Sequence, residues 1–315
     1  MTLASAAAAL APVSAPEART LRWNEQGFIF ELSSPDDVVL DMAARVFPGT
    51  RERSNNSPDR RWHVKPHVQP QVSVAEAGAV AGHKWIISDN ASDADRMEPS
   101  VRDSRESALL QIEWDVLEFL LRQSMDAVSV HAALLSRGGR GVVIVGPSFA
   151  GKSTLATAMW RAAWTLMSDD LVFLDAADHS AAPAPRRVSL RSESRGLVGD
   201  ALWSEIGGTP SCVQTLKGLF FHPHEVTGEE RISRTKLAAI FFLARRGIEI
   251  GPAETRPINP AKTALALLPY AFNTRELPFM DGLRRVTPIA GAIPAYDLGR
   301  GDLREMVNSV ERRIG

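Results

Sequence analysis

The chain has 315 residues, of which 44% are hydrophobic, so it is long enough for one large domain or two modest ones with a buried core. Its 36 basic and 37 acidic residues leave a formal net charge of −1. This balance argues against a nucleic-acid partner, since that would need a strongly basic domain or face. The single cysteine, Cys212, excludes an intrachain disulfide and a cysteine-cluster metal site.

The beginning of the chain predicts a flexible tail over residues 1–19. It is rich in alanine, but no Lys or Arg precedes the weakly apolar stretch, as a signal peptide would require. The longest apolar run, "LAAIFFLA" at 237–244, is far shorter than the roughly 20 residues that span a bilayer. We therefore expect a cytoplasmic protein with no membrane partner.

Residues 20–104 predict a small α+β domain without a catalytic motif. Residues 21–32 resemble two strands around a turn at 24–27. "SPDDVVLDMAARVF" predicts a helix with Ser34 as N-cap and Pro35 at the first helical position. The arginine-rich stretch 50–61 is typical of a loop, and "PQVSVAEAG" and "HKWIISDN" predict strands. We expect this domain to be accessory and to recognise a phosphate acceptor.

A helix over 106–123 opens the second predicted domain, residues 105–315. Its apolar residues at 109, 112, 116 and 120 follow helical spacing. Trp114 on this helix is expected to be a core residue.

A hairpin follows in "AVSVHAALLSRGGRGVVIVG". Two β-rich runs flank Gly138 and Gly139, which is a strong signal for a two-residue turn. With the glycines at the turn, the pairing register places His131 opposite Gly146. That position, beside the next motif, favours a functional role for His131 over that of an ordinary core histidine.

The motif "GPSFAGKS" at 146–153 matches the phosphate-binding pattern G-x-x-x-x-G-K-[ST]. A strand over 142–145 precedes it and a helix over 152–164 follows, which is the context that this motif requires. Backbone N–H groups and the helix N-terminus attract phosphate, Lys152 would reach the β- and γ-phosphates, and Ser153 would ligate Mg²⁺. The predicted nucleotide-binding residues are Gly146, Ser148, Phe149, Ala150, Gly151, Lys152, Ser153 and Thr154.

Phe149 occupies the fourth position of this motif, where Gly, Asn or Asp is common. Such a position has positive φ, and a bulky residue there costs on the order of 1–3 kcal/mol. Several charge-assisted phosphate contacts outweigh that cost, so we expect the loop to bind nucleotide. The alternative is that the loop shifts and the ring forms a wall beside the γ-phosphate or the acceptor.

Two adjacent acids, Asp169 and Asp170, follow the next apolar segment. Like charges placed together repel unless a cation or a proton resolves them, which favours a catalytic pair. One would act as a base toward a hydroxyl and the other would bind or orient metal-linked water. The alternative is a plain turn between helix and strand. Asp175, at the end of the apolar run "LVFLD", is another candidate for the metal-binding acid. It ranks below Asp169 and Asp170, because its side chain would lie at the far end of that strand.

The series "HAALL…GVVIVGPSFAGKSTLA…LMSDDLV" resembles the HPr kinase/phosphorylase family and its relatives, whose nucleotide-binding core is similar to that of phosphoenolpyruvate carboxykinase. "ESRGL" at 193–197 matches a later segment of the family. The resemblance implies an α/β fold with a P-loop core of mixed sheet and helices. It also implies ATP and Mg²⁺ as cofactors, Asp169 as base, His131 assisting it, Asp170 in the same network, and Ser153 with Glu193 on Mg²⁺.

The family's arginine-glycine-asparagine signature is absent from this chain, where "ARRGIEIGPAET" stands instead. The layout is more similar to the divergent HPr-kinase-related kinases, some of which phosphorylate peptides, including lasso-peptide precursors, on a serine hydroxyl. Further similarity runs through "LKGLFF", the strand "KLAAIFFLAR", the helix "NPAKTALALLPYAF" and a closing strand and helix in "IPAYDLGRGDLREMVNSV".

Positive groups for the developing phosphoryl charge are harder to locate. Arg195, Lys217, Arg231 and Arg234 are the candidates, and each could equally be a plain surface charge. "FHPHEV", with His222 and His224, predicts a loop rather than a metal site, because no carboxylate cluster is near in the sequence.

Three functions follow from these patterns. The first is a kinase that uses ATP and Mg²⁺ to phosphorylate a hydroxyl, as of serine in a peptide or protein. The second changes the acceptor to a small molecule such as a sugar, a polyol or an amino acid. The third is a nucleotide-binding regulatory protein without turnover. The oligomeric state stays open, with a homo-oligomer among the alternatives.

Overall fold

The computed structural model describes residues 19–25, 28–47, 50–52, 56–67, 84–89, 100–123, 127–215, 218–243, 250–275 and 277–314. The predicted tail, the predicted strand "PQVSVAEAG" and Lys217 lie outside these ranges, apart from Arg19, which begins a strand. The chain divides into two compact units, Met1–Ile112 and Glu113–Gly315, and the division falls within helix α2 (Arg105–Gln123).

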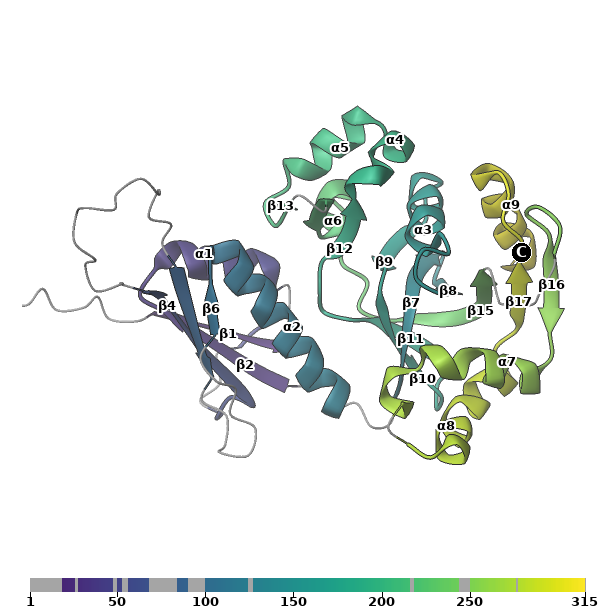
Figure 1. Ribbon diagram of the computed structural model, residues 1–315, viewed down its shortest axis with the longest axis horizontal. Helices are drawn as coiled ribbons and strands as arrows, with labels where there is room; N and C mark the ends of the chain where they lie inside the picture. The colour runs from purple at the N-terminus through teal and green to yellow at the C-terminus, as the bar shows by residue number, and fades with distance from the viewer. Residues whose placement is uncertain are drawn as a thin grey trace, which may run out of the picture. The chain divides into compact units, whose positions relative to one another are not determined.

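The Met1–Ile112 unit is a mixed six-stranded sheet with helix α1 (Figure 1). The strand order is β3-β1-β2-β4-β5-β6, with β2 and β4 parallel and the other pairs antiparallel. The bounds are β1 Arg19–Glu25, β2 Phe28–Ser34, β3 Thr50–Arg51, β4 Arg60–His67, β5 Lys84–Asp89, β6 Ser100–Arg102 and α1 Asp37–Val46. The predicted strands in 21–32 and at "HKWIISDN" are confirmed.

Aromatic side chains fill the core of this unit. Trp23 stacks on Phe30, Phe47 and Trp62, and all four rings are buried. Alternate residues of a strand share one face, so Trp23 on β1 and Phe30 on β2 meet across their ladder.

Two predictions for this unit are wrong in detail. The N-cap of α1 is Asp36, not Ser34, because the Asp36 carboxylate accepts the backbone N–H of Val38 while Ser34 still pairs in β2. The stretch 50–61 is not all loop: β3 occupies its start and β4 begins at Arg60, where both strands gain ladder hydrogen bonds.

The Glu113–Gly315 unit is a mixed α/β structure built on a larger sheet. The strand order is β11-β10-β7-β8-β15-β17-β16, with β9 also paired to β7 and β11 to β15. The bounds are β7 Ala127–Arg137, β8 Arg140–Val145, β9 Thr165–Ser168, β10 Leu171–Asp175, β11 Ser180–Pro183, β15 Thr235–Leu243, β16 Thr255–Ile258 and β17 Ala295–Leu298. Because β8, β15 and β17 are parallel, their carboxyl ends meet at one edge.

Helices cover both faces of this sheet. One core contains side chains of α3 (Lys152–Arg161) and α9 (Leu303–Ile314), and the other contains side chains of α7 (Pro260–Leu267) and α8 (Phe279–Ala292). Figure 1 shows these two pairs on opposite sides of the strands. The predicted helix over 152–164 ends earlier, because Ala163 adopts a φ of 64° and turns Trp164 into the core. The helix predicted in 259–272 ends at Leu267, just before Pro269 interrupts it.

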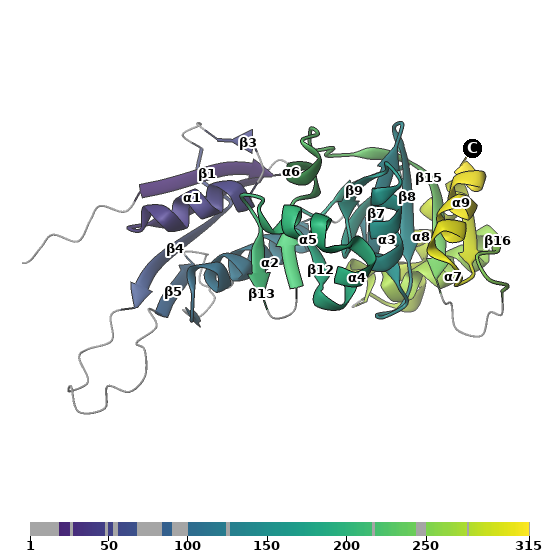
Figure 2. The same cartoon turned by 90° about the horizontal axis from the view of Figure 1, so that it is seen from above.

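A three-stranded sheet of order β12-β14-β13 completes the unit, and Figure 2 shows it beside α4 and α5. The bounds are β12 Val188–Arg191, β13 Val213–Thr215, β14 Gly218–Phe221, α4 Arg195–Val198, α5 Asp200–Gly207 and α6 Pro223–Thr227. The sequence analysis predicted none of these three strands. In the described ranges, no helix is long and apolar enough to cross a membrane.

Helix α2 has the predicted buried stripe at Leu109, Ile112, Val116 and Leu120. The prediction that Trp114 is a core residue is wrong, because its side chain is 54% exposed. Position 114 lies two residues from both 112 and 116, which turns it about 200° away from that stripe.

Candidate functional site

The hairpin has the predicted register. Ala132 pairs with Val145 and Arg137 with Arg140, so Gly138 and Gly139 form the turn, both at positive φ. The next position along β7 is His131, which pairs on its other side with Leu171 of β10. The sheet therefore carries His131 to the strand end where residues 146–153 begin.

Residues 146–153, here called the 146–153 loop, connect β8 to α3. A Cβ on Gly146 would lie 2.8 Å from the carbonyl oxygen of Leu243, so only glycine fits against the neighbouring strand. Gly151 takes a left-handed conformation with φ 99° and ψ 16° as the N-cap of α3. The loop thus brings backbone N–H groups and the helix N-terminus to one place.

Phe149 stands at the predicted positive-φ position, with φ 64°. Its ring is 82% exposed, and the guanidinium carbon of Arg191 lies 4.6 Å from the ring centroid. The cation–π contact gives a partial compensation for the backbone strain. Arg300, which follows β17, donates to the carbonyl oxygen of Phe149 at 3.4 Å.

Lys152 is folded back onto its own loop. Its Nζ lies 2.9 Å from the Gly146 carbonyl oxygen, 3.2 Å from that of Pro147 and 3.0 Å from Nε2 of His131. Burial lowers the pKa of Lys152, the charges of Asp170 and Asp169 act in the opposite direction, and Arg191 lowers it further. The ammonium is held by neutral acceptors that a phosphate could replace.

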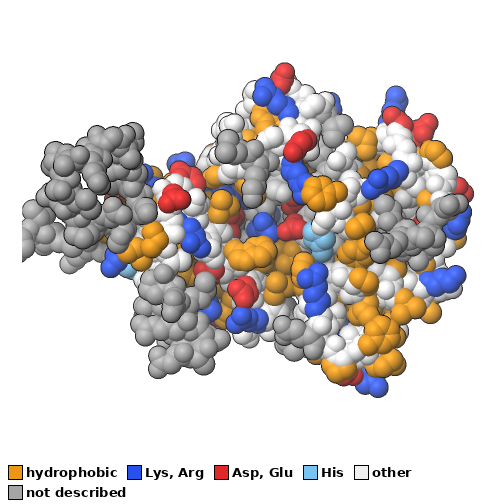
Figure 3. Space-filling view, in the orientation of Figure 1, with side chains coloured by type: hydrophobic (Ala, Val, Ile, Leu, Met, Phe, Trp, Pro, Cys, Tyr) orange, Lys and Arg blue, Asp and Glu red, His pale blue; other side chains and the backbone are white. Residues whose placement is uncertain are grey.

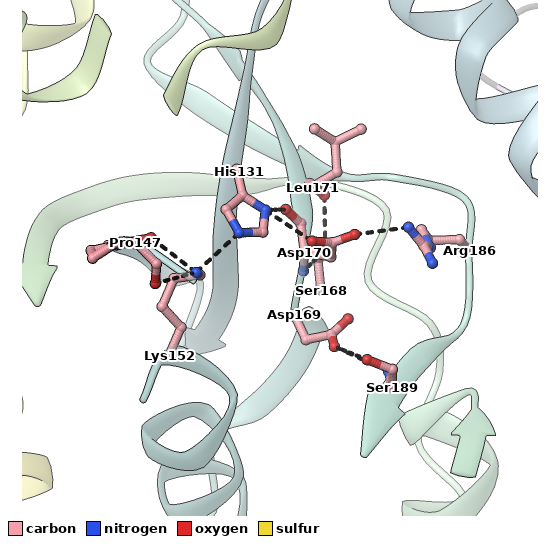
Figure 4. Close-up of polar contacts among 10 residues, drawn as sticks. His131, Pro147, Lys152, Ser168, Asp169, Asp170, Leu171, Arg186 and Ser189 are labelled. Atoms are coloured by element: carbon pink, nitrogen blue, oxygen red, sulfur yellow. Dashed lines mark hydrogen bonds and ion pairs between the residues drawn. The ribbon is translucent and has the colours of Figure 1, made fainter. Parts of the chain in front are cut away.

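His131 links Lys152 to Asp170 (Figure 4). An ammonium group only donates, so Nε2 of His131 accepts from Lys152 and the proton is on Nδ1. Nδ1 then donates to Asp170, 2.9 Å from Oδ1 and 3.0 Å from the backbone oxygen. The resemblance assigned His131 to assist Asp169, whereas its carboxylate partner in the structure is Asp170.

Asp170 is held as an anion by several donors. Its Oδ2 lies 2.8 Å from the guanidinium of Arg186. Burial alone would raise the pKa of Asp170, but the hydrogen bond from His131 and the charges of Arg186 and Lys152 outweigh burial and lower it. The group is therefore a fixed negative charge, suited to orienting its neighbours rather than to taking up a proton.

Asp169 has the opposite character. Its side chain is buried, and its Oδ2 accepts from both the backbone N–H of Ser189 at 3.1 Å and the Ser189 hydroxyl at 2.8 Å. Burial, together with the negative charge of Asp170, raises the pKa of Asp169 to about 6, although the Ser189 hydrogen bonds and Arg186 lower it. Two neighbouring acids with pKa values moved apart can divide the work of a base and of an orienting charge.

Asp169 and Asp170 lie between two consecutive strands, β9 and β10, that pair with the same neighbouring strand. Both β9 and β10 pair with β7, and residues 169 and 170 fall between them, opposite the middle of β7 next to His131. The backbone N–H of Ala132 still donates to the Asp170 carbonyl oxygen at 3.0 Å. The two aspartates therefore lie in a short turn between two strands, which was one of the two alternatives from the sequence.

Strand β12 contributes residues that the sequence analysis missed. Ser189 and Arg191 are two apart on this strand and share a face, so one reaches Asp169 and the other reaches Phe149. The alternation in "RRVSLR" was the available signal, but it named no partner.

Adjacent arginines before β12 were missed as well. Arg186 lies between Asp170 and Trp114, with its guanidinium carbon 5.4 Å from the centroid of the indole. Arg187 is buried and forms a bidentate ion pair with Glu113, at 2.9 Å and 2.6 Å. Two consecutive residues of α2 therefore hold two consecutive arginines, one facing the site and one facing the core.

The basic residues predicted from the sequence lie elsewhere. Arg234 binds Asp175 at 3.0 Å and Ser180 at 2.9 Å, at the far end of β10, and Arg195 pairs with Asp200 at 2.6 Å on the surface. Arg231 lies with Arg186, His222 and His224 around a small cavity of about 30 Å³, and Lys217 falls outside the described residues. Basic, acidic and histidine side chains meet on one face of this unit (Figure 3).

The predicted metal ligands are Ser153, half-buried in the first turn of α3, and Glu193, exposed just beyond β12. His222 and His224 have ring centroids 5.3 Å apart. Within the described ranges, no three His, Cys, Asp or Glu side chains lie close enough to hold a metal ion. Mg²⁺ usually needs only one or two carboxylates beside phosphate oxygens and water, so the side chains near the loop fit that ion when it arrives with a nucleotide.

No protein-family model matches this chain, and no curated protein matches it. Among solved structures, the chain is similar to the Hpr(Ser) kinase/phosphatase from Coxiella burnetii, with 13% sequence identity and a TM-score of 0.34. That similarity covers 59% of this chain and 87% of the other. So distant a similarity carries no argument about function, which must be drawn from the side chains themselves.

Proposed function

We propose that this protein is a phosphotransferase that uses ATP and Mg²⁺ to phosphorylate a hydroxyl group. The observation that carries the proposal is Asp169, a buried carboxyl with a pKa near 6 beside the 146–153 loop. A module that only binds nucleotide needs the loop but not a base whose pKa lies close to neutral.

The 146–153 loop supports the phosphate half of the proposal. Positive groups surround its mouth: Lys152 within it, Arg191 over Phe149, and Arg300 on the Phe149 carbonyl. On nucleotide binding, Lys152 would exchange the Gly146 and Pro147 carbonyl oxygens for phosphate oxygens, a stronger, charge-assisted contact. Ser153 and Glu193 would hold Mg²⁺, which supplies charge neutralisation on the phosphates.

Asp169 supports the part of the proposal that concerns the acceptor hydroxyl. Ser189 engages Oδ2, so we assign Oδ1 as the atom that accepts the proton of the acceptor hydroxyl. The hydroxyl oxygen then forms a bond to the γ-phosphorus while the bond to the β–γ bridging oxygen breaks and ADP leaves. Asp170 keeps His131 oriented and holds negative charge beside Asp169, which keeps the pKa of Asp169 high.

The order of motifs favours an HPr-kinase-like assignment: a hairpin histidine, the loop, the two aspartates and "ESRGL". A serine hydroxyl of a peptide or protein is the acceptor that this resemblance favours, and a small polyhydroxy molecule or amino acid is the alternative. A similarity of fold is better evidence for the type of reaction than for the identity of the acceptor.

The test is to incubate the full chain with ATP, Mg²⁺ and either serine-containing peptides or small hydroxyl compounds. Phosphate-mass shifts and ADP release would be measured. We expect Asp169→Asn to lose transfer while retaining MgADP affinity, and Lys152→Ala to weaken MgADP binding itself. Normal turnover in Asp169→Asn would disprove the role given to Asp169, and ATP binding without ADP release under any acceptor would favour a regulatory nucleotide-binding protein.

A further inference from the structure

A groove of about 410 Å³ runs between α3 and α9. Five of its lining residues lie on α3 or directly after it, and five lie on α9. The lining residues are Thr154, Thr157, Ala158, Arg161, Ala162, Leu303, Arg304, Val307, Asn308 and Glu311. Its volume is within the usual range for small-molecule sites.

One end of this groove opens next to the 146–153 loop. Thr154 directly follows the predicted Mg²⁺ ligand Ser153, and Leu303 and Arg304 are the first residues of α9. Both helices begin at the same edge of the sheet, because β8 and β17 both run parallel to β15. A chain of phosphates held by the loop therefore ends at the mouth of the groove.

The backbone before α9 is fixed against a neighbouring turn. A Cβ on Gly299 would lie 2.0 Å from the Gly251 carbonyl oxygen, and one on Gly301 would lie 2.8 Å from the Ala253 nitrogen. These close approaches hold Arg300 and the start of α9 in one position beside Phe149. On the α9 side, the mouth of the groove is therefore formed by closely packed backbone.

At the far end of the groove, the lining residue Glu311 is already bound by other side chains of the protein. Glu311 accepts from the guanidinium of Arg137 and, at 3.2 Å, from Nε1 of Trp164. The near and middle parts combine an apolar surface from Ala158, Leu303 and Val307 with the polar side chains of Thr154 and Asn308. An amide side chain offers both donors and an acceptor, as the edge of a nucleobase requires.

We propose that this groove binds the ribose and base of the nucleotide whose phosphates the 146–153 loop holds. The inference rests on the proposed function and deepens it by assigning the nucleoside subsite. Ala158, Leu303 and Val307 contact the flat face of the base, Asn308 hydrogen-bonds its edge, and Arg304 lies over the ribose and the first phosphate.

The test compares a ligand with a nucleoside to one without it. Binding of MgATP and of magnesium tripolyphosphate to the full-length protein would be measured by calorimetry. We expect the wild type to bind ATP at least about tenfold more tightly than tripolyphosphate, equivalent to about 1.4 kcal/mol. Asn308→Trp, which fills the groove from an exposed position, should reduce that preference to about twofold or less and leave tripolyphosphate affinity unchanged.

The matched control is Glu305→Trp, on the same helix but away from the groove, which should keep the preference for ATP. If Asn308→Trp does not fold, Asn308→Leu removes the amide from the same exposed position and should also lower the preference for ATP. Equal affinity of the wild type for both ligands, or an unchanged ATP preference in a folded groove variant, overturns the nucleoside subsite. An unchanged affinity of Lys152→Ala for both ligands would instead contradict the proposed function.

Discussion

The buried carboxyl of Asp169 lowers the stability of the folded protein when it is ionised. The side chain is 6% exposed and its pKa is raised to about 6 by burial and by the charge of Asp170. Its hydrogen bonds from Ser189 do not outweigh these effects. The folded protein therefore binds the Asp169 proton more tightly than the unfolded chain does, and it is penalised once that proton is lost.

Asp169→Asn should consequently stabilise the fold at neutral pH while abolishing transfer. Below about pH 4 the carboxyl is protonated in both states, so it contributes no penalty. Between the ordinary value of 3.8 and about 6 the folded state keeps the proton, and stability falls as pH rises through this window. The full penalty above pH 6 is about 3 kcal/mol. Urea unfolding at pH 4 and pH 7 would measure it: the variant's advantage should appear only at pH 7, and an equal difference at both values would contradict the argument.

Phe149 stores strain at an exposed position. Its φ of 64° is unfavourable for a side chain with a Cβ, and the ring gains only the contact with Arg191. Phe149 lies at the exposed tip of the loop, whereas in the proposed function Lys152 and the backbone of the loop would bind the phosphates. We therefore expect the ring to affect acceptor phosphorylation more than nucleotide affinity.

Substituting Phe149 by Gly and by Ala separates strain from side-chain function. Both variants remove the ring, but only glycine relieves the backbone, so Phe149→Gly should be more stable than Phe149→Ala by about 1 kcal/mol. Both should retain MgADP affinity and change the rate of acceptor phosphorylation. Thermal unfolding and calorimetry check the two parts. If the variants lose nucleotide affinity with unchanged turnover kinetics, Phe149 belongs to the nucleotide site instead.

At the scale of elements, β12 and the segment before it connect separate parts of the site. Two of its side chains bind the aspartates: Arg186 forms an ion pair with Asp170, and Ser189 donates a hydrogen bond to Asp169. The other two are Arg187, which forms a buried ion pair with Glu113, and Arg191, which contacts the ring of Phe149. One short stretch therefore fixes both aspartates and the loop tip. Its own anchor is the ion pair between Arg187 and Glu113, whose side chains are 1% and 6% exposed.

Removing one partner of this ion pair should lower the free energy of unfolding strongly, whereas replacing both partners should lower it little. Glu113→Ala leaves a buried guanidinium without its carboxylate, which costs about 3–5 kcal/mol. The double variant Glu113→Leu with Arg187→Met removes both charges and should recover most of that loss. As a control, Arg195→Met removes the exposed pair with Asp200 and should cost less than about 1 kcal/mol. Urea unfolding of the wild type and these three variants gives their free energies of unfolding, and a double variant no more stable than Glu113→Ala would contradict the argument.

At the scale of the whole molecule, local signals predicted the central elements well. The hairpin glycines fixed the register that carries His131, and the 146–153 motif predicted a strand, a loop and a helix in the right order. These features depend on contacts between residues close in sequence, where periodicity and turn chemistry are informative. The adjacent acids Asp169 and Asp170 were also evident in the sequence, and the charge of Asp170 adds to burial in raising the pKa of Asp169.

Distant contacts were what the sequence did not reveal. Ser189 meets Asp169 across 20 positions, Arg187 meets Glu113 across 74, and Arg300 meets Phe149 across 151. No spacing rule selects these arginines from the others in the chain. Arg195 and Arg234 were candidates because phosphoryl transfer favours positive groups, yet folding pairs them with Asp200 and Asp175.

The division of the chain within α2 leads to a prediction about fragments. The second half of α2 belongs to the Glu113–Gly315 unit and carries Glu113, so a fragment of residues 105–315 retains the partner of Arg187. It should fold and bind MgADP like the full chain. A fragment of residues 124–315 buries Arg187 without a carboxylate and should unfold at lower temperature or fail to fold. Introducing Arg187→Met into the shorter fragment removes the orphaned charge, and the melting temperature should partly recover. Equal melting temperatures and MgADP affinities for the two unsubstituted fragments would mean that α2 is dispensable to the nucleotide-binding unit.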